Sequence, residues 1–519
     1  MLLSTIIFLP ILFAVVMLVW PQKSTLRPLA LGFSLIEFFI SLTILQKFDT
    51  STAALQLVEK YSWIPRFGIN YFIGIDGISL WLVLLTTFLT PIIILASWKS
   101  IEEKESGFHA CFFVLQAAML GTFLAFDAIF FYVFWELSLI PMYFIVGIWG
   151  GQRRIYATVK FFIYTMAGSV LMLIAIIYMM FLAQENFGQM SASLLDFYKL
   201  KIPFVGGTFF SLQTLLFFAF AIAFAIKVPI FPLHTWLPDA HVEAPTPGSV
   251  VLAGVMLKMG TYCFVRFVIP LFPEAAEYWS WLFLFLAVIG IIYGALVAMV
   301  QPDIKKLVAY SSVSHMGYIM LGLFIFNQYG LTGSLFQMLN HGISTGALFI
   351  LIGMIYERTH SREISKYGGL AGVMPIYSIF FFIVLLSSIA VPMTNGFVGE
   401  FLILLGTFKD HQGYAYFAVS GVVLGAVYML WMFKRVFFGE KGILTIDEKH
   451  PLHDLNIREI VVLVPMVIMI FWMGLFPNHF LDWSKTSIEH LLNNRMNYEL
   501  STSPISGLDT TLPQTNHGE

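Results

Sequence analysis

Residues 221–260 read AIAFAIKVPIFPLHTWLPDAHVEAPTPGSVVLAGVMLKMG and join two strongly apolar runs through a polar, proline-rich linker. The first run reaches Lys227 and is followed by Pro229 and Pro232. Proline lacks a backbone N–H and clashes with the preceding turn, so we expect the helix to break here. The second run carries Lys258, and a lysine at the centre of a membrane helix costs about 3 kcal/mol. Broken helix and charge together predict a site that moves ions, because both require a protein-lined or water-lined cavity.

The composition predicts an all-α polytopic membrane protein. Of the 519 residues, 59% are hydrophobic and 11% are charged, whereas soluble domains are about 25% charged. The net charge of −2 suggests no nucleic-acid partner. The two cysteines are isolated, and the sequence contains no GxGxxG or GxxxxGK[ST] stretch. We therefore expect no metal, iron–sulfur cluster, NADH, FMN or other cofactor on this chain.

Apolar runs long enough to cross a bilayer recur about fourteen times along the chain. They cover residues 2–20, 27–46, 76–98, 107–126, 128–149, 157–182, 209–237, 247–269, 279–299, 303–326, 330–356, 373–408, 413–436 and 459–480. The odd-numbered connections between these spans carry most of the 28 Lys and Arg residues. Because basic connections stay in the cytoplasm, we expect them to face the cytoplasm and both termini to lie on the other side.

Two of these spans are interrupted. Span 7 is broken by its two prolines, and span 12 is broken around Pro392, in SSIAVPMTNGFVGEF. Their spacing fits two five-helix repeats, spans 4–8 and 9–13, and the second is inverted because five is odd. The alternative is that prolines are simply common in membrane helices. The repeats divide the chain into N-terminal transmembrane helices, a first repeat, an inverted second repeat, and a last helix with a polar tail, at residues 1–106, 107–269, 279–436 and 437–519.

Glu136 is the only charged residue of span 5 and lies near its middle. A lone buried carboxylate is unfavourable unless a cation pairs with it. Lys227 is the natural partner, because it comes from the fourth helix of the same repeat and Glu136 from the second. The alternative is a static ion pair that only holds two helices together.

Spans 10 and 11 each carry a histidine among polar residues. His315 lies among serines, and His341 belongs to a stripe at three- and four-residue spacing with Ser334, Gln337, Asn340, Ser344 and Thr345. Such a stripe can hold ordered water, and the alternative is interhelical hydrogen bonding. Lys305 and Lys306 are expected to snorkel from the end of span 10.

The ionisable groups expected inside the membrane are Glu136, Lys227, Lys258, His315, His341 and Glu400. They favour a proton relay, because histidine and a desolvated lysine can titrate near neutral pH. Asp239 and Glu243, in the connection after span 7, are expected to be solvated loop acids. His234 and His241 are separated by prolines and do not have metal-ligand spacing.

Several stretches carry a family resemblance. They are FYVFWELSLIPMYFIVGIWG, FAIKVPIFPLHTWLPDAHVEAPTPGSVVLAGVMLKMGTY, DIKKLVAYSSVSHMGY, LNHGISTGALFILIGMIYERT and NGFVGEFLILLGTF. Together with nearly the whole chain they resemble the antiporter-like subunits of respiratory complex I, the bacterial type I NADH:quinone oxidoreductase. The M-type members, equivalent to mitochondrial subunit four, are the most similar. Glu400 supports this, since the L- and N-type members and most antiporter subunits have lysine at the matching position.

The resemblance implies roles for individual residues. Glu136 and Lys227 match the family's glutamate–lysine pair, Lys258 matches the linking lysine, and Glu400 matches the end of the second half-channel. His315 and His341 match the central histidines.

The resemblance also implies partners and a location. The expected neighbours are antiporter-like L- and N-type subunits and small membrane subunits, with FMN, iron–sulfur clusters, NADH and quinone bound elsewhere in the complex. The expected location is the bacterial inner membrane rather than a thylakoid or other energy-transducing membrane. Two alternatives are a subunit of an Mrp-type cation/proton antiporter and a passive scaffold between neighbours.

Overall fold

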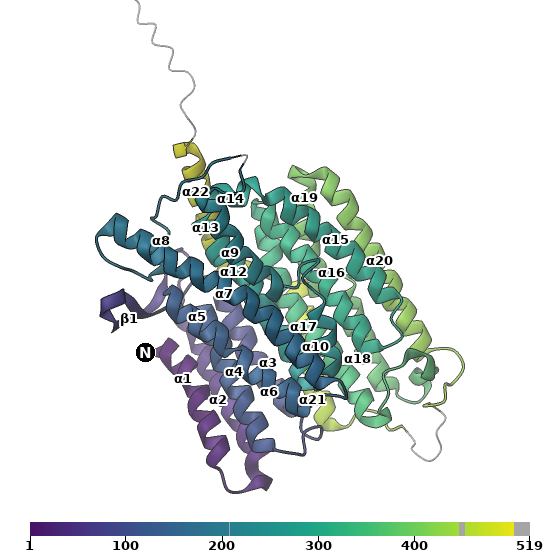
Figure 1. The fold of residues 1–519 in the computed structure, drawn as a ribbon. Coiled ribbons are helices and arrows are strands. Elements are labelled where there is room, and N and C mark those ends of the chain that lie inside the picture. The colour runs from purple at the N-terminus through teal and green to yellow at the C-terminus, as the bar shows by residue number, and fades with distance from the viewer. Residues whose placement is uncertain (207, 446–451, 503–519) are drawn as a thin grey trace, which may run out of the picture.

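Long helices lie side by side in the computed structural model, which describes residues 1–206, 208–445 and 452–502 (Figure 1). Within these residues, eleven helices are long and apolar enough to cross a membrane. Three shorter apolar helices, α3 (Leu80–Ala96), α9 (Leu212–Lys227) and α18 (Pro375–Ser388), fall in predicted spans 3, 7 and 12. The predicted class, a helical polytopic membrane protein, is confirmed, and the count of fourteen spans stays a prediction.

The N-terminal part contains the one departure from an all-α fold that the described residues show. In chain order it consists of α1 (Leu2–Val19), η1 (Lys23–Thr25), α2 (Leu26–Lys47), β1 (Gln56–Ile64), η2 (Pro65–Phe67), β2 (Ile69–Ile75) and α3. The strands β1 and β2 form an antiparallel hairpin with Tyr61 opposite Tyr71. Gly68 closes the turn at φ +63°, a conformation that glycine adopts at little cost. The hairpin forms in the connection between predicted spans 2 and 3, where aromatic and β-branched residues favour strands.

The first repeat shows the predicted break after Lys227. Its elements are α4 (Glu105–Leu124), α5 (Ala128–Leu137), α6 (Leu139–Trp149), α7 (Arg154–Phe187), α8 (Leu194–Phe197), α9, α10 (Trp236–Glu243), α11 (Thr246–Val251), η3 (Leu252–Met256), α12 (Leu257–Cys263), η4 (Phe264–Val268), α13 (Ile269–Leu271) and α14 (Pro273–Tyr278). At the break, the Trp236 indole donates to the Ile226 carbonyl at 2.8 Å. Span 5 is also interrupted, at Ser138, where Pro141 offers no N–H to the Leu137 carbonyl.

The second repeat is broken between α18 and α19, as predicted. It comprises α15 (Ser280–Met299), α16 (Ile304–Phe324), α17 (Gln328–Thr359), η5 (Ile364–Lys366), η6 (Leu370–Gly372), α18, α19 (Asn395–Asp410) and α20 (Gln412–Phe437). Its helices pack in the same order as those of the first repeat: the second on the first and third, the third on the broken fourth, and the fifth on the fourth and first. This agrees with two repeats, and the domain boundaries stay a prediction.

The C-terminal part is more helical than expected. Helix α21 (Ile457–Leu475) is followed by a further helix, α22 (Asn478–Thr502), in the polar tail. The Trp81 indole donates to the Phe480 carbonyl at 2.9 Å, and the Gly77 N–H donates to the Ser487 hydroxyl at 3.1 Å. Helix α22 is thereby tied to the start of α3. The rest of the predicted tail, residues 503–519, lies outside the described residues.

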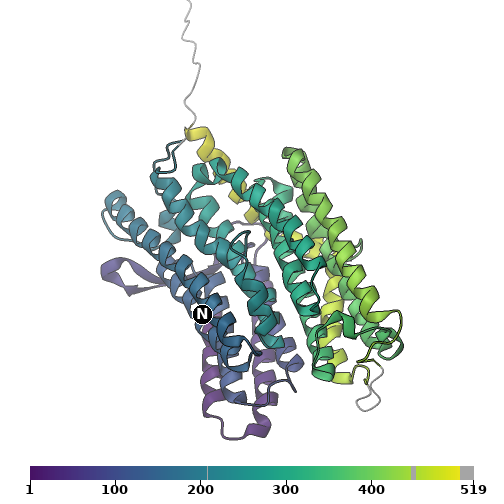
Figure 2. The ribbon, with the colours of Figure 1, turned by 45° about the vertical axis from the view of Figure 1, so that its right-hand side comes forward.

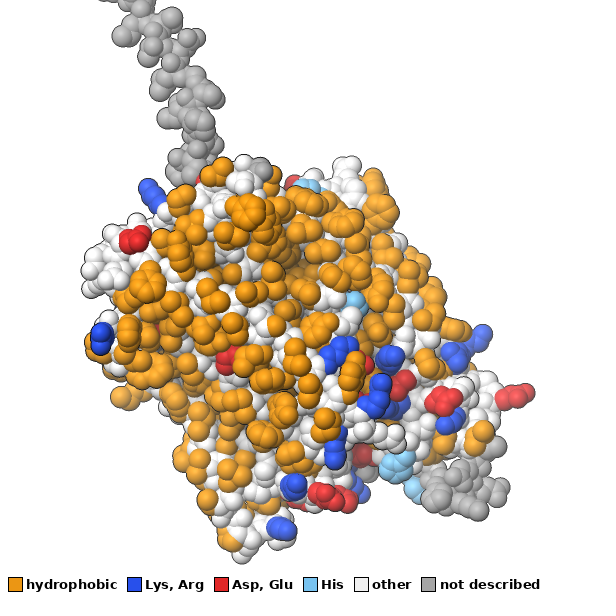
Figure 3. Space-filling view, viewed as in Figure 1, with side chains coloured by type: hydrophobic (Ala, Val, Ile, Leu, Met, Phe, Trp, Pro, Cys, Tyr) orange, Lys and Arg blue, Asp and Glu red, His pale blue; other side chains and the backbone are white. Residues whose placement is uncertain are grey.

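The outer surface has the character of a membrane protein. Figure 2 shows the N-terminal helices on one side of the bundle and α20, the last helix of the second repeat, on the other. On the face drawn in Figure 3, hydrophobic side chains cover a broad area and Lys and Arg gather toward its lower edge. This distribution agrees with the asymmetry of basic residues in the sequence.

Candidate proton-relay site

Four of the six predicted site residues form one buried row, which begins in the fifth helix of the first repeat and continues into the second repeat. The Lys258 ammonium, on α12, donates to the Ala253 carbonyl and lies 2.7 Å from His341 Nδ1 on α17. The His341 and His315 rings meet edge to face with centroids 5.9 Å apart. His315 Nδ1, on α16, lies 2.9 Å from Glu400 Oε1 on α19. Each side chain in the row is thus next to another group that can accept or release a proton.

The polar stripe of α17 supports this row. Its residues Ser334, Gln337, Asn340, His341, Ser344 and Thr345 are all buried. Gln337 Nε2 donates to Glu400 Oε1 at 3.1 Å and Gln337 Oε1 accepts from Asn340 Nδ2 at 3.0 Å. The His341 Nε2 atom is buried and has no hydrogen-bond partner among the described residues. Buried polar atoms without a partner are rare, which sets His341 Nε2 apart from the other atoms of the stripe.

Glu136 and Lys227 lie near each other but do not form the predicted ion pair in this conformation. Lys227 is buried and donates to Ser138 Oγ at 3.2 Å, and its ammonium lies 4.9 Å from the centre of the Trp135 ring. No ion pair joins it to Glu136 in the described part of the chain, and Glu136 Oε1 is buried without a partner. The reason is the position of each side chain around the helix axis. Trp135 and Ser138 are three residues apart and share a face of the helical segment, whereas the Glu136 side chain points about 100° away from that of Trp135.

The structure does not connect Lys227 to Lys258. Within the described ranges, no hydrogen bond joins Lys227 to Lys258. The helices that carry them, α9 and α12, pack tightly against each other. A Cβ added to Gly260 would lie 2.7 Å from Val228 Cγ2 and 3.0 Å from the Phe224 carbonyl oxygen. Glu136 and Lys227 therefore form one cluster, and Lys258, His341, His315 and Glu400 form another.

Two expectations about charges near the helix ends were wrong. Lys305 does not snorkel: it is buried and donates to the Ala244 carbonyl at 2.5 Å. Glu243 is not a solvated loop acid, because it is buried and accepts from the Arg153 N–H at 2.9 Å. Asp239 is partly buried and accepts from Lys160 Nζ at 2.7 Å. The physical reason is that α10 folds back into the bundle, where carbonyls and acids need internal donors.

Sequence reasoning did not find every buried titratable residue, and His241 and Glu37 are two examples. His241, on α10, stacks on Phe349 with ring centroids 4.6 Å apart, and neither ring nitrogen has a partner among the described residues. Glu37, on α2, is fully buried between Ser34 and Ser41, and both carboxyl oxygens lack a described partner. A lone acid within an apolar run was the signal for Glu37. For His241 the sequence shows only that its spacing from His234 does not suit a metal, and spacing alone does not show that its side chain turns inward.

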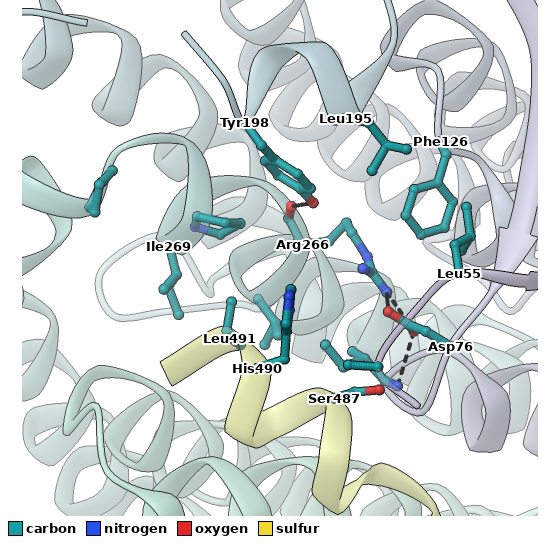
Figure 4. Close-up of a pocket in the computed structure, with 15 residues that line it drawn as sticks. Leu55, Asp76, Phe126, Leu195, Tyr198, Arg266, Ile269, Ser487, His490 and Leu491 are labelled. Atoms are coloured by element: carbon teal, nitrogen blue, oxygen red, sulfur yellow. Dashed lines mark hydrogen bonds and ion pairs between the residues drawn. The ribbon is translucent and has the colours of Figure 1, made fainter. Parts of the chain in front are cut away.

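The sequence reading also missed a buried ion pair between Arg266 and Asp76. Arg266 Nη2 donates to both Asp76 oxygens at 2.7 Å, and Arg266 Nε donates to the Tyr262 hydroxyl at 3.2 Å. The pair forms part of the wall of a cavity of about 390 Å³, opposite His490 of α22 (Figure 4). Because Asp76 also accepts from the N–H groups of Ile78 and Ser79, the pair fixes the start of α3 against η4. It lies outside the Lys–His–Glu row.

In the described ranges, no three His, Cys, Asp or Glu side chains are placed to hold a metal ion. The arrangement is one of single proton-binding groups in an apolar bundle.

Comparisons with known proteins identify the family. Two protein-family models match: NADH-ubiquinone oxidoreductase chain 4, amino terminus, over residues 2–126, and NADH:quinone oxidoreductase/Mrp antiporter, TM, over residues 125–425. NADH-quinone oxidoreductase subunit M of Rhodobacter capsulatus is 45% identical, covering 95% of this chain and 96% of that protein. NADH-ubiquinone oxidoreductase chain 4 of Marchantia polymorpha is 42% identical, with 95% and 97% covered.

Solved structures agree with this assignment. A chain of respiratory complex I from Thermus thermophilus superposes with a TM-score of 0.83 at 31% identity, covering 95% of this chain and 100% of that one. A chain of the Mrp complex from Dietzia sp. DQ12-45-1b gives a TM-score of 0.82 with 96% and 99% covered, but at 21% identity this shows the fold alone. The chain belongs to the antiporter-like membrane subunits of NADH:quinone oxidoreductase, in the group of subunit M and chain 4.

Proposed function

We propose that this chain is the proton-translocating M-type subunit of a bacterial NADH:quinone oxidoreductase. The observation that carries the proposal is the buried row from Lys258 through His341 and His315 to Glu400. Each ionisable group in the row costs free energy, because it must be desolvated inside an apolar bundle. A row of four such groups therefore favours a functional role over a structural one. NADH, FMN, the iron–sulfur clusters and quinone belong to partner subunits. The chain sits in the inner membrane with both termini on the non-cytoplasmic side.

The Glu136–Lys227 cluster acts as the switch. Burial favours the neutral form of a lysine, whereas a nearby carboxylate favours the ammonium. The conformation described here is the open one, in which Lys227 is held by Ser138 and Trp135 rather than by Glu136. When Glu136 pairs with Lys227, the lysine binds a proton. When the pair separates, the lysine releases that proton toward Lys258. The tight contact at Gly260 must loosen or admit water for that transfer.

The trigger comes from a neighbouring subunit. Glu136 is only partly buried and lies between Val133 and Ile140, whose side chains are 42% and 52% exposed. A carboxylate at the edge of an exposed apolar face is unfavourable in lipid, so this face suits a partner that supplies polar groups. The expected partners are the L- or N-type antiporter-like subunits or the small membrane subunits. A charge moving there would open or close the Glu136–Lys227 pair.

The free energy needed to move one proton across the membrane is moderate. Moving one charge against 100 mV costs about 2.3 kcal/mol. A change of about two units in the proton affinity of one buried group supplies energy of that order, at 1.36 kcal/mol per unit.

The proposal is tested on the intact complex that contains this chain, purified from membranes and reconstituted in vesicles. NADH-dependent quinone reduction accompanied by proton uptake is the expected result. Sodium/proton exchange that proceeds without NADH or quinone would instead support an Mrp-type antiporter, and quinone reduction with no proton movement would contradict the proposal.

A further inference from the structure

Glu400 is held by two donors on the same oxygen. Its Oε1 atom lies 2.9 Å from His315 Nδ1 and 3.1 Å from Gln337 Nε2. Among the described residues, no hydrogen bond reaches Oε2. The two carboxyl oxygens of Glu400 therefore have different surroundings, one with two donors and one with no donor among the described residues.

The Gln337 amide is itself fixed in place. Its Oε1 atom accepts from Asn340 Nδ2 at 3.0 Å, so both ends of the amide are engaged. Gly399, next to Glu400 in sequence, provides the space: an added Cβ would lie 2.3 Å from Gln337 Oε1 and 2.7 Å from Asn340 Nδ2. Real Cβ atoms do not approach so closely, so only glycine allows this amide pair beside Glu400.

We propose that Gln337 is a positioning residue that fixes which oxygen of Glu400 receives a proton. The proposal rests on the proposed function of the row and adds direction to it. The terminal torsion of a glutamate is broad and nearly two-fold, so a carboxylate held by His315 alone can exchange its oxygens. A second donor on Oε1 opposes that exchange while the carboxylate is charged, because rotation would break both hydrogen bonds. Oε1 then takes the proton from His315 Nδ1, and the neutral carboxyl, held less strongly by the two donors, rotates so that the same oxygen releases the proton on the other side.

Two hydroxyls on α16 and α17, the helices of His315 and Gln337, do not duplicate this role. The hydroxyl of Tyr318, on α16, donates to the Ala418 carbonyl at 2.7 Å. Ser334 donates to the Ile319 carbonyl at 2.8 Å. Both are committed to backbone carbonyls, which leaves Gln337 as the amide donor that the described structure places on this carboxylate.

The test uses Gln337→Met in the intact complex, because methionine keeps the length of the side chain and removes both polar atoms. Infrared difference spectroscopy reports the Glu400 carboxyl band, which is assigned as the band lost in Glu400→Gln. We expect Gln337→Met to shift this band and to lower proton uptake about tenfold, the usual worth of a hydrogen bond to a charged group. An unshifted band together with wild-type uptake would overturn the proposal.

Gln116→Met is the matched control. Gln116 is a fully buried glutamine on α4 whose polar side-chain atoms have no described partner. Gln116→Met should therefore change neither the Glu400 carboxyl band nor proton uptake. If Gln337→Met does not assemble, Gln337→Asn withdraws the amide by one methylene and should shift the same band, and an unshifted band there also refutes the proposal. The band can be read even in a complex that does not pump, so failure of the positioning role is distinguishable from failure of the proposed function.

Discussion

Replacing Lys227 with arginine is expected to remove most proton translocation while the complex still assembles. Arginine keeps the positive charge, and its planar side chain can still contact Ser138 and the Trp135 ring. It cannot release a proton at a usable pH, because its pKa lies above 12. We expect a loss of about tenfold or more, since a desolvated group that cannot change charge blocks the switch.

The measurement is the rate of proton uptake by reconstituted vesicles during NADH oxidation. Lys160→Arg is the control, since Lys160 forms a partly exposed ion pair with Asp239 and should tolerate the exchange. If Lys227 were only a fixed counter-charge, Lys227→Arg would pump at nearly the wild-type rate.

Replacing Glu136 with glutamine is expected to cause a similarly large loss of pumping and of coupled electron transfer. Glutamine fills the same space but cannot attract the Lys227 ammonium, so the closed state of the switch is lost. In the conformation described here no ion pair is broken by this change, because Lys227 is held by other groups. Assembly and thermal stability should therefore be close to wild type.

This separation of activity from stability distinguishes a switch from a static ion pair. Proton uptake and melting temperature are measured together, with the exposed Glu102→Gln as the control. A static pair predicts a lower melting temperature with pumping retained, and that outcome would refute the switching role.

The sequence was most informative about the membrane interior. Hydrocarbon forces backbone groups into helices, so apolar runs marked the spans, and prolines without N–H groups marked the breaks beside Lys227 and Glu400. The same physics identified Lys258, His315, His341 and Glu400, because an ionisable side chain inside such a helix costs free energy and is therefore rare there. The structure brings these four together in one row.

The sequence was least informative where tertiary contacts decide the outcome. Lys305 and Glu243 lie close to helix ends, where exposure and burial are equally compatible with the local pattern, and the inward fold of α10 buried both. The Glu136–Lys227 geometry depends on how α5 is rotated after its interruption at Ser138, which spacing along the chain does not specify. The hairpin of β1 and β2 lies between predicted spans 2 and 3, in a connection without an apolar run of span length.

The central claim, that protons pass along the Lys–His–Glu row, is tested most directly at His341, which joins Lys258 to His315. Phenylalanine at this position keeps an aromatic side chain and removes both ring nitrogens of the histidine. The number of protons taken up per NADH oxidised is measured in vesicles for His341→Phe and for His109→Phe, a buried histidine of α4 outside the row. The account predicts a marked fall for His341→Phe and a wild-type ratio for His109→Phe. A wild-type ratio in the His341→Phe complex would contradict it.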